Sequence, residues 1–197
     1  MLYEKKKLLE VKNLSCKRNY KLIFKNISFS LEPGGVIFIN GNNGSGKTSL
    51  LLALSGILQC EGIKKMSQDQ IGYVGHKNAL NETETVREYL YFWKNIFSYK
   101  YDYNHIVKYF QLKSLLDMQI SMLSFGQKKK LSFSRLKMTN TQLWLLDEPV
   151  SGLDQKTKLL ILKLINQHTE NGGGVIITSH QNLNLNKIKN IKRVNID

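Results

Sequence analysis

The fold of this chain is decided by one stretch of sequence, Val36-Ile37-Phe38-Ile39-Asn40-Gly41-Asn42-Asn43-Gly44-Ser45-Gly46-Lys47-Thr48. Its apolar first part predicts a strand that is buried on both faces of a parallel sheet. Residues 41–48 match the pattern GxxxxGK(S/T) at every fixed position, and residues 48–58 predict a helix directly after the loop. A glycine-rich loop between a buried strand and a helix is an arrangement that binds phosphate groups.

The residue types in this loop predict a site for ATP and Mg²⁺. The glycines let backbone N–H groups approach phosphate oxygens, and the start of the helix adds about half a positive charge. Lys47 is expected to reach the β- and γ-phosphates, and the Thr48 hydroxyl is expected to ligate Mg²⁺. The predicted nucleotide-binding residues of the loop are Gly41, Asn42, Asn43, Gly44, Ser45, Gly46, Lys47, Thr48 and Ser49.

A second apolar run, residues 143–146, predicts a strand that ends in Asp147 and Glu148. By itself, such an ending is a common boundary between a strand and a turn. With a phosphate-binding loop in the same chain, however, the first carboxylate is expected to hold Mg²⁺ together with Thr48. The second, Glu148, is then placed to polarise the attacking water. We therefore predict Thr48 and Asp147 at the metal and Glu148 as a catalytic residue.

Three further motifs narrow the family. The chain carries Leu123-Ser124-Phe125-Gly126-Gln127 at the head of a predicted helix, Ser151-Gly152-Leu153-Asp154 shortly after Glu148, and His180 after the predicted strand 175–178. With these motifs the chain resembles the ATP-binding-cassette (ABC) ATPases, whose signature reads LSGGQ. The resemblance extends from the strand at Leu8 to His180. It implies an α/β fold: a P-loop NTPase core with an N-terminal antiparallel β flap and an inserted α-helical subdomain.

The same resemblance implies that ATP is hydrolysed between two copies of the chain. In a head-to-tail homodimer, the signature residues Ser124, Phe125, Gly126 and Gln127 would act on the ATP of the partner subunit, with Asp154 in the D-loop beside them. His180 would be the catalytic switch histidine. A single copy would hydrolyse ATP poorly, because half of each site belongs to the other chain.

At three positions the sequence departs from the family pattern. Phe125 replaces the first glycine of the signature, which is tolerable if its side chain points away from the nucleotide. His76 stands where most members have a glutamine, and we predict it as a third catalytic residue because it can contact water or metal. Arg18 stands where many relatives stack an aromatic ring on adenine. A guanidinium can also stack on a base, so Arg18 joins the predicted nucleotide-binding residues.

Softer sequence strings indicate a subfamily. Tyr73-Val74-Gly75-His76, residues 143–149 and residues 167–181 make the chain similar to the ATP-binding subunits of the cytochrome c maturation system. This resemblance implies docking on the integral membrane subunit CcmB, with CcmC and CcmD nearby, in a so-called haem exporter. ATP turnover there is thought to release the haem-loaded chaperone CcmE. The implied location is the cytoplasmic face of the bacterial inner membrane, or the matrix face of the mitochondrial inner membrane if the chain is organelle-encoded.

Length and composition predict a single domain. The chain has 197 residues, of which 42% are apolar and only two are proline, and this composition is typical of a globular chain. We expect a core at residues 1–81 and 139–197 and a helical subdomain at about 82–138. Strands are predicted at 8–14 and 27–31 in the flap, and at 71–74, 175–178 and 191–196 in the core. The most apolar stretch, residues 50–54, is far shorter than the roughly 18 residues of a membrane span.

The net charge of +14 predicts an anionic partner. Charge does not distinguish phosphates, an acidic membrane and nucleic acid, so a DNA- or ribosome-acting member of the superfamily stays open. Such relatives generally carry two cassettes or a long coiled-coil insertion, which this chain does not have, so no nucleic acid is expected. A subunit of a different transporter is another alternative. A scaffold without turnover is a third, but Glu148 and His180 argue against it.

Several other side chains have plainer interpretations. Lys128, Lys129 and Lys130 after the signature predict a solvated helix face, with a role for some of them at the dimer seam or the nucleotide as the alternative. Arg135 is expected to brace the signature by pairing with an acidic neighbour. Trp93 and the aromatic residues around it predict the core of the helical subdomain. His168 is expected to have a surface or packing role. Cys16 and Cys60 are predicted to be reduced thiols.

Overall fold

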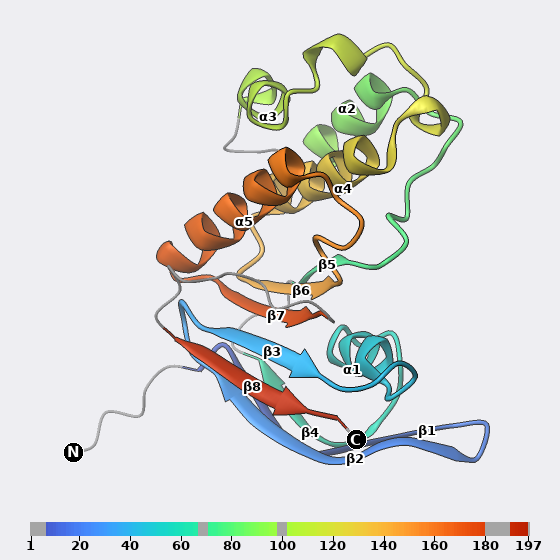
Figure 1. Ribbon diagram of the computed structural model, residues 1–197. Helices are drawn as coiled ribbons and strands as arrows, with labels where there is room; N and C mark the ends of the chain where they lie inside the picture. The colour runs from blue at the N-terminus through green and yellow to red at the C-terminus, as the bar shows by residue number, and fades with distance from the viewer. Residues whose placement is uncertain (1–6, 67–70, 98–101, 180–189, 197) are drawn as a thin grey trace.

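The computed structural model describes residues 7–66, 71–97, 102–179 and 190–196. Two sheets form the body of the molecule: a three-stranded sheet of order β2-β1-β4 and a five-stranded sheet of order β5-β6-β7-β3-β8. Figure 1 shows helix α1 between the two sheets and the other helices above the five-stranded sheet. The α/β class and the antiparallel flap are as predicted.

All strand pairs of the five-stranded sheet are parallel. Its strands are β3 (Val36–Asn40), β5 (Ile71–Val74), β6 (Leu143–Asp147), β7 (Gly174–Thr178) and β8 (Ile191–Asn195). Every residue of β6 and β7 is buried, and β3 is buried up to its last residue. This burial on both faces explains why the central strands are unbroken apolar runs. The four predicted core strands and the short strand at 191–196 are therefore confirmed.

The antiparallel sheet contains β1 (Leu9–Arg18), β2 (Lys21–Leu31) and β4 (Glu61–Met66). The first two confirm the predicted flap strands but are longer, because a two-residue turn at Asn19 and Tyr20 joins them into one hairpin. Both turn residues have positive φ, as hairpin turns of this length require. β4 was not predicted, since its residues are mostly polar and exposed. It forms by pairing with β1.

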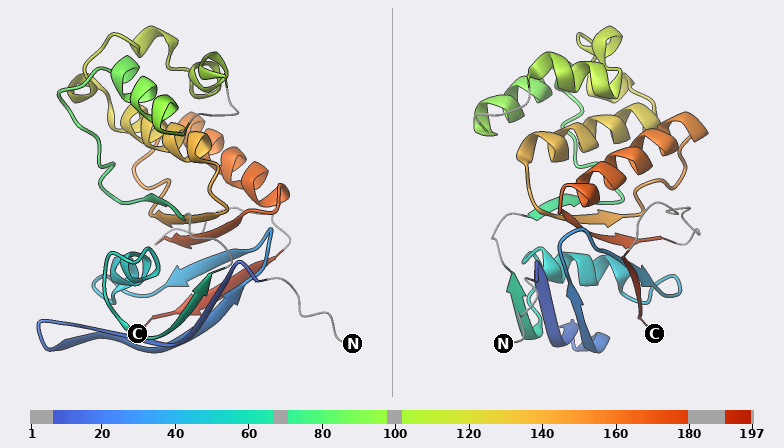
Figure 2. Two further views of the ribbon diagram at one scale, coloured as in Figure 1. Left: turned by 180° about the vertical axis from the view of Figure 1, so that it is seen from behind. Right: turned by 90° about the vertical axis from the view of Figure 1, so that its left-hand side faces the viewer.

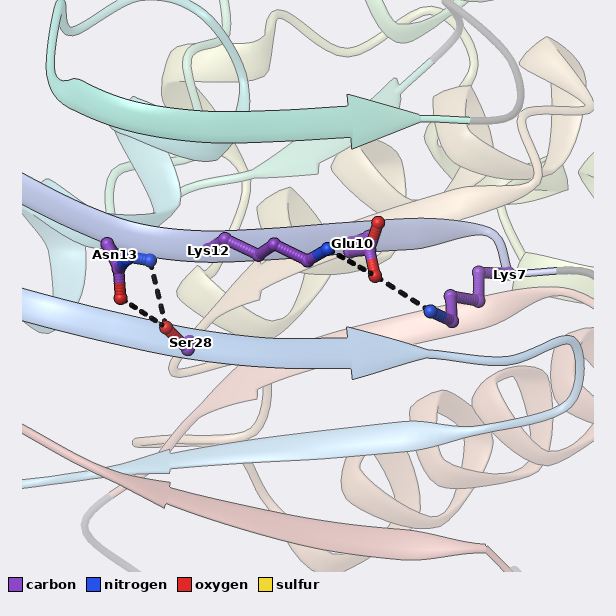
Figure 3. Close-up of polar contacts among 5 residues, drawn as sticks. All are labelled: Lys7, Glu10, Lys12, Asn13 and Ser28. Carbon is purple, nitrogen blue, oxygen red and sulfur yellow. Dashed lines mark hydrogen bonds and ion pairs between the residues drawn. The ribbon is translucent and has the colours of Figure 1, made fainter.

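Polar contacts lie along the outer side of this hairpin (Figure 3). The Glu10 carboxylate lies 2.7 Å from the Lys7 ammonium and 3.5 Å from that of Lys12, and the hydrogen bond from Lys7 is the main cause of its lowered pKa. Across the strands, the Asn13 N–H donates to the Ser28 hydroxyl at 2.8 Å. These contacts lie at the surface, where single ion pairs contribute little to stability.

Helices lie between β3 and β5, between β5 and β6, and between β6 and β7. They are α1 (Lys47–Leu54), α2 (Val86–Phe97), α3 (Tyr103–Phe110), the 3₁₀ turns Lys113–Leu115 and Ile120–Met122, α4 (Phe125–Thr139) and α5 (Gln155–Glu170). α1 ends earlier than predicted, because Ser55 is its C-cap residue and Gly56 follows with a φ of 83°. α2, α3 and most of α4 fall within residues 82–138. The division of the chain at those residues stays a prediction. Within the described part of the chain, no helix is both long enough and apolar enough to cross a membrane.

Two hydrophobic clusters lie on opposite faces of the parallel sheet (Figure 2). Alternate residues of β6 point to opposite faces, so Leu146 packs with α4 and α5 in one cluster while Leu145 packs with α1 in the other. Trp93 packs against the first cluster, which confirms it as part of the helical core. The parallel sheet thus separates α1 from α4.

His168 stacks on Trp144, which belongs to the first cluster. The rings of His168 and Trp144 are 3.7 Å apart between centroids and tilted by only 5°, and His168 Nε2 is 3.2 Å from the carbonyl oxygen of Gln142. Burial lowers the pKa of His168 to about 4. His168 therefore packs as a neutral ring, as expected.

Candidate functional site

The carboxyl ends of the parallel strands bring the predicted site residues to one edge of the sheet. β3 leads into the glycine-rich loop, β6 ends at Asp147, β7 ends at Thr178, and β5 leads to Gly75 and His76. Because neighbouring strands run parallel, all these ends lie on the same side. In open α/β sheets, ligands bind in the crevice outside this edge.

The glycine-rich loop packs tightly against its surroundings. A Cβ atom on Gly46 would lie 2.6 Å from Cγ2 of Ile23, and the φ of Gly46 is 100°, where side chains are rarely tolerated. A Cβ on Gly41 would collide with the carbonyl oxygen of Ile196 and with the Ser45 hydroxyl. Gly46 is also the N-cap of α1, so the loop delivers a helix N-terminus to the edge of the sheet. Asn42, Asn43 and Gly44 are exposed at the tip of the loop.

The ammonium group of Lys47 lies against this loop. Its ammonium donates hydrogen bonds to the carbonyl oxygens of Gly41 and Asn42, both at 2.8 Å. The side chain is buried. A cation that is fixed at a helix N-terminus, among glycines that have no side chain to cover the backbone, is suited to bind an anion.

Asp147 is the centre of a small oxygen cluster. Thr48 Oγ1 donates to Asp147 Oδ2 at 2.8 Å, and the hydroxyl of Thr178 donates to the other carboxylate oxygen. Asp147 is only 3% exposed, so these two hydroxyls compensate the burial of its charge. Hydroxyl and carboxylate oxygens are the ligands that Mg²⁺ prefers, so Thr48 and Asp147 fit the metal predicted for them.

Thr178 was not predicted as a site residue. It follows an apolar run as an ordinary strand residue, and nothing in its own sequence context marks it. Its position depends on the register between β6 and β7, which places Asp147 directly opposite Thr178. Thr178 could have been identified only if the register between β6 and β7 had been known in advance.

Glu148 has a strained backbone. Its φ is 46°, in the left-handed region that residues other than glycine seldom adopt. The strain is held in place because the Glu148 N–H donates to the carbonyl oxygen of Thr178 at 3.1 Å and to its hydroxyl at 3.2 Å. Strained residues of this kind cluster at functional sites. Here the outlier is the residue predicted to act on water.

The other predicted residues of this edge are placed to different degrees. His76 is exposed on the loop after β5, the strand that neighbours β6. Arg18 is exposed at the end of β1, on the hairpin whose second strand packs Ile23 against Gly46. His180 lies outside the described residues.

The signature residues begin α4 with a reciprocal cap. Ser124 Oγ accepts a hydrogen bond from the Gln127 N–H at 3.3 Å, and Gln127 Oε1 accepts one from the Ser124 N–H at 2.8 Å. This capping box satisfies two backbone donors at the helix start. A hydroxyl that accepts can donate its own hydrogen at the same time, so Ser124 keeps the capacity to bind an anion.

The signature and the D-loop lie side by side. A Cβ on Gly126 would be 3.4 Å from Asp154 Oδ2, and one on Gly152 would be 3.5 Å from the Phe125 ring. Asp154 caps α5 by accepting from the N–H and hydroxyl of Thr157, and these hydrogen bonds lower its pKa. Phe125 is 45% exposed, so its ring lies at the surface.

Two expectations for α4 are wrong. Lys129 is completely buried, and its ammonium donates to the carbonyl oxygen of Gly75 at 3.3 Å. The solvated face was predicted for three consecutive lysines, but a helix that packs on β5 turns one of every three or four residues inward. Lys128 does reach the surface and pairs with Glu82 at 2.6 Å. Arg135 donates to the carbonyl oxygen of Tyr73 at 2.8 Å rather than to an acidic side chain.

Comparison with known proteins identifies the family. The family model described as ABC transporter matches residues 24–151. A protein of Wolbachia pipientis wMel named cytochrome c biogenesis ATP-binding export protein CcmA is 39% identical over 185 residues, covering 88% of this chain and 89% of the relative. Proteins with the same name are 37% identical in Reclinomonas americana, covering 91% and 87%, and 35% identical in Legionella pneumophila, covering 91% and 96%.

Solved structures share the fold. The structure of an ATP-binding subunit of an ABC transporter superposes with a TM-score of 0.79 at 23% identity, covering 88% of this chain and 79% of the other. A nucleotide-free ATP-binding cassette from an ABC transporter gives 0.77 at 22% identity, covering 96% and 88%. At these identities the likeness concerns the fold.

Proposed function

The chain belongs to the ABC transporter family of ATP-binding proteins, and from this premise we propose that it is the ATP-hydrolysing subunit of a cytochrome c maturation complex. ATP hydrolysis follows from the family. The cytochrome c assignment is supported by relatives of 35–39% identity over about nine-tenths of the chain, all named for that process. The structural observation that carries the ATPase is the Thr48–Asp147 contact, which joins the phosphate loop to the carboxylate of β6.

The proposed reaction is ATP + H₂O → ADP + phosphate. Lys47 and the N–H groups of the loop bind the phosphates, Thr48 and Asp147 hold Mg²⁺, and Arg18 stacks on the base. Bound Mg²⁺ neutralises the charge that develops on the phosphate oxygens. Glu148 accepts a hydrogen bond from the attacking water. The strained backbone at this residue sets the direction in which its side chain leaves the main chain. His76 and His180 complete the proposed catalytic set.

We propose that each ATP-binding site is completed by residues of a second copy of the chain. The loop leads into α1 on one face of the parallel sheet, whereas the signature begins α4 on the other face. Two groups separated by a packed sheet are poorly placed to close on the same phosphate. In a head-to-tail homodimer, Ser124 and the backbone of Gly126 would instead face the γ-phosphate bound by the partner subunit, with Asp154 beside them.

The proposed membrane partner is a CcmB-like integral subunit, with CcmC-, CcmD- and CcmE-like proteins in the same complex and release of haem-loaded CcmE as the outcome. An apolar patch on α2 supports a docking role for the helical segment: Tyr91, Phe92 and Ile96 are 41%, 55% and 51% exposed. Adjacent exposed apolar residues of this kind mark interaction sites. The proposed location is the inner face of the membrane that holds this subunit.

A pull-down from solubilised membranes tests the assignment. The tagged wild-type chain should recover a CcmB-like membrane protein, and Phe92→Ser should reduce that recovery at least about fivefold if the α2 patch is the docking surface. Leu159→Ser is the matched control, because Leu159 is equally exposed at 57% but lies on α5. Recovery of a different membrane subunit would indicate another transporter. Recovery of rRNA or DNA would favour a nucleic-acid-associated ATPase.

A further inference from the structure

Helix α4 carries a row of hydrogen-bond donors that the proposed chemistry does not use. Lys129, Ser132 and Arg135 follow one another at intervals of three residues and therefore share one face of the helix. Each donates to a backbone carbonyl of residues 73–78, the segment that runs from the end of β5 past His76: Lys129 to Gly75 at 3.3 Å, Ser132 to Asn78 at 3.1 Å and Arg135 to Tyr73 at 2.8 Å. The Ser132 hydroxyl also lies 3.2 Å from the Lys128 carbonyl oxygen within its own helix. The row thus holds this segment on both sides of His76.

Lys129 stands out in this row because its charge is fully buried. The side chain is 0% exposed, and burial lowers its pKa to about 8 although the negative charges of Asp147 and Glu148 oppose that change. Taking an ammonium group out of water costs several kcal/mol, which one hydrogen bond to a neutral carbonyl does not offset. An apolar side chain of the same length would fill the space at a lower cost. Stability therefore does not explain why a lysine occupies this position.

The surroundings of the ammonium indicate what it does. On one side lies the Gly75 carbonyl, next to His76, and the carboxylates of Asp147 and Glu148 act on it electrostatically. α4 itself begins at the signature, one turn away. Lys129 is therefore in contact with the His76 loop, within the field of the β6 carboxylates, and on the helix that starts at the second anion site.

We propose that Lys129 is a positioning residue for ATP hydrolysis. It holds the Gly75 carbonyl, so that His76 stays at the carboxyl edge of the sheet and keeps its position relative to α4. The inference rests on the proposed function of the site. Lys129 itself touches no substrate in this proposal and acts through His76. Ser132 and Arg135 keep the rest of the segment in register.

Steady-state hydrolysis by Lys129→Met tests the proposal. This variant keeps the length and the packing but removes the donor, so kcat should fall about tenfold to a hundredfold while the Kd for ATP stays within about threefold. The melting temperature should be unchanged or higher, since a buried charge is replaced by an apolar group. Lys137→Met is the matched control on the same helix, where the ammonium lies over the Tyr109 ring at 4.7 Å, and its kcat should match the wild type.

Two further variants separate positioning from packing. Lys129→Gln keeps a neutral donor and should retain kcat within about threefold of the wild type. In a double-mutant cycle, Lys129→Met combined with His76→Ala should lose no more kcat than the worse single variant, because both act through one loop.

The outcomes that contradict the proposal are distinct. Wild-type kcat in Lys129→Met, or equal losses in the Met and Gln variants, would overturn the role of the donor. Losses that add in the cycle would show that Lys129 does not act through His76. A fall in melting temperature together with ATP affinity would make Lys129 a structural residue. An inactive wild type would instead contradict the ATPase, and this inference with it.

Discussion

The Thr48 hydroxyl donates a hydrogen bond to the Asp147 carboxylate at 2.8 Å, although 99 positions separate the two residues in sequence. The contact joins the start of α1 to the end of β6. It fixes the phosphate loop relative to the Asp147 carboxylate.

Lys47→Ala should lower the affinity for ATP about a hundredfold or more. Loss of two charge-assisted hydrogen bonds to phosphate, each worth about 1.5 kcal/mol, accounts for this change. Isothermal titration with Mg²⁺-ATP measures it. Lys64→Ala is the control, because Lys64 also donates to backbone carbonyls, those of Ala53 and Leu54, but at the opposite end of α1. Wild-type binding by Lys47→Ala would remove the phosphate role of the loop.

Glu148→Gln should lower kcat about a hundredfold to ten-thousandfold, because the amide cannot accept the proton of the attacking water. ATP binding should persist, so the nucleotide-loaded dimer should accumulate and elute ahead of the monomer in size-exclusion chromatography. Asp117→Asn, at a surface carboxylate paired with Arg87, should leave kcat and elution unchanged. A Glu148→Gln chain that binds ATP yet remains monomeric would contradict the two-copy site.

Thr178→Val should destabilise the fold by about 1–3 kcal/mol, because the buried Asp147 carboxylate loses one of its two hydroxyl donors. Urea unfolding measures the loss, and kcat should fall with it as the metal ligand becomes mobile. Thr169→Val is the comparison: its hydroxyl is also buried but donates to a carbonyl within its own helix. Equal stability losses in both variants would mean that the Asp147 contact has no special weight.

His168 should make the stability depend on pH between about 6.5 and 4. Burial lowers the pKa of the folded state to about 4 from the ordinary 6.5, so in this window the unfolded chain binds more protons and stability rises with pH. The stabilisation is fully present above pH 6.5 and is lost as the pH falls through 4, with a total of roughly 3 kcal/mol at most. His168→Phe keeps the stack on Trp144 and should flatten this part of the profile in urea titrations. An identical slope in the two proteins would rule out His168 as the cause.

The core strands and the glycine-rich loop could be predicted because their signals are local. A buried parallel strand is an apolar run, and the loop needs glycines at fixed positions, as the contact of Gly46 with Ile23 shows. β4 escaped prediction because backbone pairing with β1, rather than its own side chains, makes it a strand. Thr178 and Lys129 escaped for a related reason: strand register and the rotation of α4 against β5 decide what each one touches.

The separation of the phosphate loop and the signature by the parallel sheet has a consequence for how activity depends on protein level. If each chain carries two half-sites on opposite faces, turnover by free chains rises with the square of their concentration until pairing saturates. A membrane subunit that docks two copies side by side would raise their effective concentration to the millimolar range without altering any catalytic group. Assembly would then switch the enzyme on by bringing two chains together, and free chains would waste little ATP.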